Sequence, residues 1–239
     1  MSVTLSDLQT NLRSLTNRSD LDTTLEVYLI NSAIKMLETS GAYKGEDTTD
    51  TISSPAISSG ATGTLAIALP LKSDGTPDCR DFTNLEQIAP TYQSGLAVIE
   101  RTKALLLYRT LTTLSNTSLE TVVVENETLY FYPPYTADNA YSAGHWQWNV
   151  YYKKWLDALV NPTDNNYFTN NGYHCIMPTI MAMTYWKLRE FDVGNSYLSI
   201  AYTLAKQFVV SEYGQAVAGD FVTRGEFENI FKKFAEGQQ

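Results

Sequence analysis

Apolar residues recur at helical spacing near both ends of the chain, whereas the middle of the chain has strand-like alternation. Leu5, Leu8, Leu12 and Leu15 form one stripe of a first helix. A second predicted helix, residues 21–39, has two apolar stripes: Leu21, Leu25, Leu29, Ala33 and Met36, and Val27, Ile30, Ile34 and Leu37. Both faces of such a helix must be covered. We therefore expect one face to pack within the chain and the face with Val27, Ile30 and Ile34 to form a subunit interface.

Residue types at the predicted helix ends support these boundaries. Thr4 with Asp7, and Thr223 with Glu226, have the spacing of a capping box. Ser19 or Asp20 is the expected N-cap of the second helix, which Gly41 closes.

Two more helices are predicted in the C-terminal third. The first has an apolar face running from Met177 to Phe191, and the second has one running from Leu198 to Val209. The short polar segment 192–195 between them predicts an antiparallel pair. Together with the two N-terminal helices, this pair predicts a four-helix bundle.

The middle of the chain reads as a small antiparallel β domain. Residues 122–124 and 129–132 predict a hairpin around the polar turn 125–128, which Pro133 and Pro134 end. A third strand spans residues 146–152, where Trp146 and Trp148 share one face by alternation. We expect these two tryptophans, like Val27, Ile30 and Ile34, to lie at the subunit interface. Further expectations are strands at 64–69 and 82–92, a loop over 43–63 and a short helix over 99–108.

The last residues predict a short amphipathic helix that follows a linker containing Gly214 and Gly219. Its apolar stripe consists of Phe227, Ile230, Phe231 and Phe234, and Phe221 precedes it. A helix of about a dozen residues does not persist alone in water. We therefore expect an arm that folds against a partner through these five apolar residues.

These elements predict an α+β fold in which an antiparallel helical bundle carries an inserted β domain and a C-terminal arm. The expected divisions are an N-terminal helix pair at 1–42, the β-rich domain at 43–160, a C-terminal helix pair at 161–214 and the arm at 215–239.

Residues that could carry chemistry do not form a recognisable site. His145 and His174 lie in aromatic or apolar surroundings, and Cys79 and Cys175 are far apart in sequence. The chain has no nucleophile elbow, phosphate-binding glycine loop or calcium-loop spacing. We therefore predict no catalytic, cofactor-binding or metal-binding residues, although the fold could still bring carboxylates together as in a hydrolase.

Charge and aromatic content narrow the possible partners. The chain of 239 residues has a formal charge of −9, which argues against gripping nucleic acid and suits a surface past which DNA slides. No apolar run reaches the roughly 20 residues of a membrane span, and the N-terminus lacks signal-peptide features, so a soluble, unsecreted protein is expected. The 16 tyrosines and four tryptophans are typical of interfaces. An alternative is a tail-associated carbohydrate-binding module that uses Trp146, Trp148 and Tyr151.

In their order, these segments resemble the head–tail adaptor (connector) proteins of tailed bacteriophages. The resemblance rests on the turn Asn-Arg-Ser-Asp-Leu at residues 17–21, the strand end Leu-Tyr-Phe-Tyr-Pro-Pro at 129–134 with the aromatic strand at 149–154, and the Asn-rich loop at 165–171 before the helix pair at 174–213. Residues 43–63 and those after Gly214 have no counterpart in it.

The resemblance implies a non-catalytic ring of copies, usually twelve, located at the neck of the virion. Such a ring lies between the portal protein and a tail or nozzle protein, extends the channel for the genomic DNA and helps to retain the genome. The resemblance also implies a helical bundle with an inserted β domain.

Overall fold

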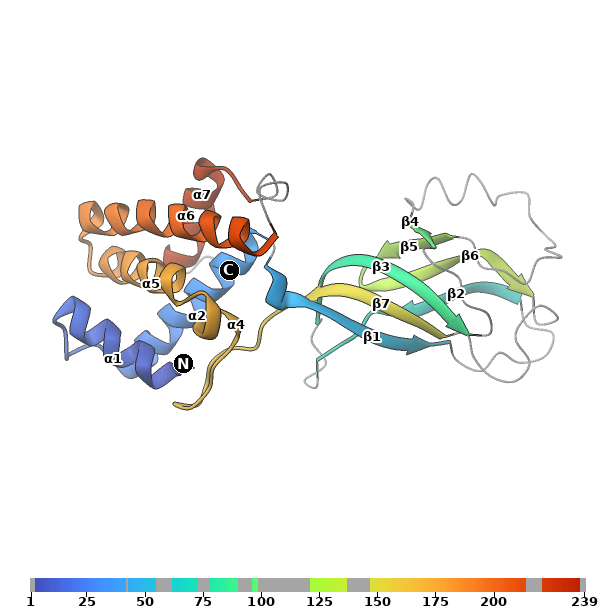
Figure 1. Ribbon diagram of the computed structural model, residues 1–239, viewed down its shortest axis with the longest axis horizontal. Coiled ribbons are helices and arrows are strands. Elements are labelled where there is room, and N and C mark those ends of the chain that lie inside the picture. The colour runs from blue at the N-terminus through green and yellow to red at the C-terminus, as the bar shows by residue number, and fades with distance from the viewer. Residues whose placement is uncertain are drawn as a thin grey trace. The chain divides into compact units, whose positions relative to one another are not determined.

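The computed structural model divides into two compact units, Met1–Glu46 with Leu156–Gln239, and Asp47–Trp155 (Figure 1). It describes residues 3–41, 43–54, 62–72, 78–89, 96–98, 121–136, 147–213 and 221–236. The chain is mixed helix and strand with mainly antiparallel sheets, which confirms the α+β class. The expected helix at 99–108, Trp146, His145 and both linker glycines lie outside the described residues.

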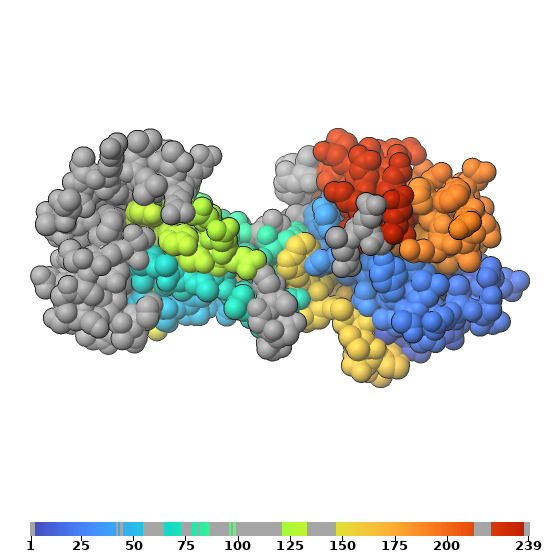
Figure 2. All heavy atoms as spheres, turned by 180° about the vertical axis from the view of Figure 1, so that it is seen from behind, coloured from blue at the N-terminus to red at the C-terminus, as the bar shows by residue number. Residues whose placement is uncertain are grey.

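The helical unit is built from both ends of the chain. Its elements are α1 (Leu5–Thr16), α2 (Thr23–Ser40), the single turn η1 (Lys44–Glu46), α4 (Tyr167–Asn171), α5 (Tyr173–Lys187), α6 (Phe191–Tyr213) and α7 (Arg224–Glu236). All six α-helices contribute to one apolar core. The red and blue segments in Figure 2, from opposite ends of the chain, lie in this unit.

The two predicted capping boxes are confirmed. The Thr4 hydroxyl accepts from the Asp7 backbone N–H, and the Asp7 carboxylate accepts from the Thr4 N–H at 2.9 Å. Thr223 and Glu226 make the equivalent pair at α7. The predicted cap of α2 is wrong: Asp22 is the N-cap, because Asp20 instead pairs with Arg18 in the turn between the helices.

An ion pair between a partly exposed arginine and a buried glutamate joins α1 to α2. Glu26 is fully buried and accepts two hydrogen bonds from the Arg13 guanidinium and a third from the Gln9 amide. A buried carboxylate is tolerated only with such partners. This pair therefore fixes the first two helices against each other.

The connection between α5 and α6 differs from the prediction. The turn lies at residues 188–190, where Arg189 has φ 63°, and α6 already begins at Phe191. Gly194, expected in the turn, instead lies inside α6, where an added Cβ would be 2.4 Å from Cδ1 of Trp186. Glycine is required there by close packing against the indole.

The β unit consists of two sheets that share one core. The first has the order β1 (Asp47–Ser53), β7 (Gln147–Lys154) and β3 (Cys79–Ala89), and the second has the order β2 (Thr62–Ala68), β6 (Thr128–Thr136), β5 (Thr121–Glu125) and β4 (Ala97–Val98). Phe131 on β6 stacks on Trp148 of β7 with ring centroids 4.3 Å apart. The buried residues of both sheets form one cluster, as in a sandwich.

The predicted hairpin is confirmed with a tighter turn. Glu125 pairs with Thr128, so only Asn126 and Glu127 turn, both with positive φ (48° and 59°) as a two-residue hairpin requires. The prolines do not end the strand. Beyond Tyr132, β6 no longer pairs with β5, and its pairing with β2 shifts register between Gly63 and Leu65. Such an irregularity tolerates residues that lack an N–H.

The prediction of a loop over residues 43–63 is wrong for β1. This strand, with the sequence Asp-Thr-Thr-Asp-Thr-Ile-Ser, is polar because it lies at the edge of its sheet and pairs only with β7 among the described strands. Ile52 is its one apolar contribution to the core. Exposed edge strands are commonly protected by charged residues, so the hydrophobic pattern of a buried strand is missing.

Candidate interaction surface

The surfaces expected to contact other subunits are largely covered within the helical unit. Ile30 and Ile34 of α2 are buried in its core, and Val27 packs against that core. The predicted subunit interface on this face is therefore wrong for Ile30 and Ile34. α7 and α5 pack against α2. They cover the apolar stripe that was expected to contact another subunit.

The prediction of an uncovered C-terminal arm is also wrong for the described residues. Phe227 and Phe231 are fully buried in the helical core, Phe221 is buried beside them, and Ile230 and Phe234 pack against the same cluster. The Tyr28 hydroxyl donates to the Phe234 carbonyl, and Phe231 meets Trp186 edge to face. The stripe thus binds its own chain, because α7 folds back onto α2 and α5.

The aromatic residues expected to bind sugar do not form a platform in the described part of the chain. Trp148 is fully buried between the two sheets. Tyr151 alternates to the other face of β7, where its hydroxyl donates to Glu86 at 2.8 Å. Trp148 is therefore a core residue. The carbohydrate-binding alternative and the predicted subunit interface are both wrong for Trp148.

Two carboxylates meet at one tyrosine in the β unit. The buried Tyr152 hydroxyl lies 3.0 Å from Oδ2 of Asp78 and 3.4 Å from Oδ2 of Asp50. Burial, and then the hydrogen bond to Asp78, raise the pKa of Tyr152. The hydroxyl donates its single proton here, so the contact ties β1 and the start of β3 to β7.

The histidine and the cysteine of the helical unit, His174 and Cys175, both contact other residues of that unit. His174 meets the Phe208 ring edge to face, and burial raises the pKa of the Cys175 thiol to about 12. Across the described ranges, no three His, Cys, Asp or Glu residues gather as metal ligands would. In those ranges, no helix has the length and apolarity that crossing a bilayer requires.

One helix face does have the character of an interface. On α6, Val193 and Ile200 are 40% and 47% exposed, and Tyr197 and Leu204 are half-buried beside them. Tyr197 stacks on Tyr185 of α5 with planes 7° apart. These residues recur at spacings of four, three and four, so they form one stripe along the helix. We call this stripe, with Ser196 and Thr203, the α6 face.

The polar members of the α6 face are already hydrogen-bonded. The Ser196 hydroxyl donates to the Asp192 carbonyl and the Thr203 hydroxyl donates to the Ser199 carbonyl, both at 3.0 Å. Such hydroxyls can lose water without leaving a donor unpaired. A contact over this face would therefore cost little desolvation.

No residue of the α6 face is itself charged, although the Arg224 guanidinium of α7 donates to the Ser199 hydroxyl beside it. Residues 193–205 contain no Asp, Glu, Lys or Arg, whereas the exposed residues of α7 include Arg224, Glu226, Lys232 and Lys233. Depletion of charge and enrichment in aromatic residues mark the centres of protein interfaces. The sequence shows that residues 193–205 carry no charge. Only the fold shows which side of α6 is not covered by α5.

The chain matches no protein-family model and no curated protein.

Proposed function

We propose that this protein is a structural head–tail adaptor of a tailed bacteriophage. The observation that carries the proposal is the arrangement of the chain, in which a helical unit formed by both ends is interrupted by a β sandwich at Asp47–Trp155. The family that the sequence resembles has this order of parts. The resemblance extends over most of the chain, including the α1–α2 turn and the segment that leads into α5.

Within the helical unit, we infer that α1, α2, α5 and α6 form the antiparallel bundle that the resemblance implies. In support, α5 packs against α6, α2 and α1, and α1 packs against α2. α7 adds a fifth long helix that covers α2, which the resemblance does not include. The bundle core is continuous through all of them.

In this proposal the protein performs no catalysis. Copies close a ring, of twelve in the family it resembles, at the virion neck, where they bind the portal on one side and a tail or nozzle protein on the other. The genomic DNA passes through the channel without sequence-specific contacts, since a chain with a charge of −9 offers phosphates little attraction. The protein would be made in the host cytoplasm and incorporated into the virion.

The α6 face replaces the C-terminal arm as the surface that supports assembly. It is the uncharged, partly apolar strip described above, and its hydroxyls are internally bonded. Two copies that each carry net negative charge repel where their acidic surfaces meet, so an uncharged surface favours their association.

Binding to the portal tests this function. Purified protein is mixed with the portal ring of the phage that encodes it, and the mass of the product is measured by multi-angle light scattering. We expect a stable complex with several copies per portal, and none with the portal of an unrelated phage. No complex with its own portal at any salt concentration or temperature would contradict the proposal.

A further inference from the structure

Two helices lie on opposite sides of α5 in the helical unit. α5 packs against α6 and also against α1 (Figure 1). The buried residues of α1 are Leu5, Leu8 and Leu12, so its opposite side faces away from the core. On α6, Tyr197 lies against Tyr185 of α5, whereas Val193 and Ile200 remain exposed. One copy therefore presents two separate outer surfaces.

The outer surface of α1 carries a row of short polar side chains. Ser6, Thr10 and Ser14 are exposed at successive turns, and all three are small. The Thr10 hydroxyl donates to the Ser6 carbonyl at 2.9 Å, so it too is bonded within its helix. We call these three residues the α1 face. The larger Val193 and Ile200 of the α6 face are complementary to it in size.

We propose that the α6 face of one copy packs against the α1 face of the next copy in the ring. The inference rests on the proposed function and names the contact between neighbours. A contact between two different faces leaves one face of each kind open at every step, so it continues until the ring closes. A contact of the α6 face with itself would instead stop at two copies.

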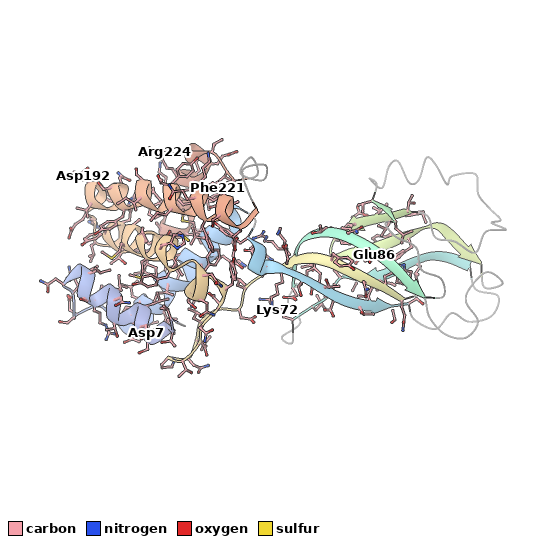
Figure 3. All side chains as sticks on the ribbon, in the orientation of Figure 1. Asp7, Lys72, Glu86, Asp192, Phe221 and Arg224 are labelled. Carbon is pink, nitrogen blue, oxygen red and sulfur yellow. The ribbon has the colours of Figure 1, made fainter. Side chains whose placement is uncertain are left out.

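Charge and direction favour a second copy as the occupant. Within the helical unit, α1 and α6 run in roughly opposite directions, as the positions of Asp7 and Asp192 near their starts indicate (Figure 3). Neighbours in a ring are related by a small rotation, which preserves these directions. The antiparallel contact places the C-terminal half of α6, with exposed Lys206, near the N-terminal half of α1, with Asp7. Opposite charges thus flank a neutral centre.

Disulfide trapping tests the contact directly. In a Cys79→Ser background, one chain carries Thr10→Cys and a second chain carries Ile200→Cys, and the two are mixed on the portal and oxidised. We expect a cross-linked pair only when both variants are present. A control pair places the first cysteine at Asn229, which is exposed on the outer side of α7. Cross-linking of the control pair but not of the Thr10–Ile200 pair, or of Ile200→Cys with itself, would overturn the inference.

A substitution that places a charge in the centre of the contact gives an independent measure. Ile200→Arg should weaken ring formation about tenfold or more, because it buries an unpaired charge, and Asn229→Arg should not. Both variants should keep the helical circular-dichroism signal, since both positions are exposed. Normal rings from Ile200→Arg would refute this contact and leave the adaptor function standing. If the unmodified chain never associates with the portal or with itself, the function and the contact both fail.

Discussion

The side-chain amide of Asn31 bonds both main-chain groups of Leu159. Its Nδ2 donates to the Leu159 carbonyl at 2.9 Å, and its Oδ1 accepts from the Leu159 N–H at 2.8 Å. Seven residues further along α2, the buried Glu38 carboxylate accepts from the Leu156 N–H at 2.6 Å. These two polar residues of α2 hold the segment by which the chain re-enters the helical unit.

Replacing Asn31 by Ala should therefore destabilise the helical unit. The change leaves a buried N–H and a buried carbonyl of Leu159 without partners, which costs about 2 kcal/mol in the free energy of unfolding. Urea denaturation followed by circular dichroism measures the change. Asn229→Ala, at an exposed position, serves as the control. Equal midpoints for the two variants would show that the Asn31 bonds do not contribute.

Phe231→Ala tests whether the C-terminal helix belongs to the core. Phe231 is fully buried against Trp186, so removing its ring should lower the free energy of unfolding by about 3–5 kcal/mol. Lys232→Ala, on the exposed side of the same helix, should change it by less than about 0.5 kcal/mol. Thermal denaturation compares the two. If Phe231→Ala leaves the melting temperature unchanged, α7 is not part of the core and is a free arm, as the sequence predicted.

Two glycine substitutions with opposite expected signs test the packing of α5 on α6. Gly194→Ala should destabilise by about 1–3 kcal/mol, because the new methyl group would overlap Trp186 and lie 3.2 Å from the Ala182 carbonyl oxygen. Gly225→Ala on α7 meets nothing within 4 Å and should stabilise by about 0.5 kcal/mol. Chemical denaturation of both variants measures the difference. A stabilising Gly194→Ala would mean that the helices are less closely packed.

Acid should weaken the helical unit through carboxylates that accept backbone hydrogen bonds in turns and helix caps. Backbone N–H donors of Asn161 and Val160 lower the pKa of Asp164, and Thr4 and Thr223 lower the pKa values of Asp7 and Glu226. Because these folded-state values lie below the ordinary ones, the unfolded chain takes up protons first as the pH falls. Their contribution is present above the ordinary pKa, 3.8 for Asp164, and disappears as the pH falls through the folded value.

Asp164→Asn isolates one of these groups. The variant should melt below the unmodified chain at pH 7. The difference in melting temperature should narrow as the pH falls below the ordinary carboxyl pKa of 3.8, because the unfolded chain then takes up a proton that folded Asp164 does not. Glu236→Gln, at an exposed position at the end of α7, is measured alongside as the matched charge-removing variant. A gap for Asp164→Asn that stays constant from pH 7 to pH 3 would contradict the assignment.

Features set by neighbouring residues could be predicted from the sequence. The Thr4–Asp7 and Thr223–Glu226 caps depend on residues three apart, and the alternation at Trp148 and Tyr152 assigns both to one face of β7. The helices α1, α2, α5, α6 and α7 and the β5–β6 hairpin also followed from such local patterns.

Features that depend on distant residues could not be predicted in this way. The stripe with Phe227 and Phe231 shows that a partner surface exists, but periodicity does not distinguish the chain's own α2 and α5 from another subunit. Gly194 suggested a turn, although its role is to make room for Trp186. β1 was missed because an edge strand needs few apolar residues. Likewise, Ile200 became a candidate contact only once the fold left it exposed.

Electron microscopy of the protein bound to its portal tests the adaptor assignment most directly. The account predicts a closed ring of copies, coaxial with the portal, in which each helical unit contacts the next through α6 and α1. Single copies scattered around the portal, or density found only away from its axis, would contradict it.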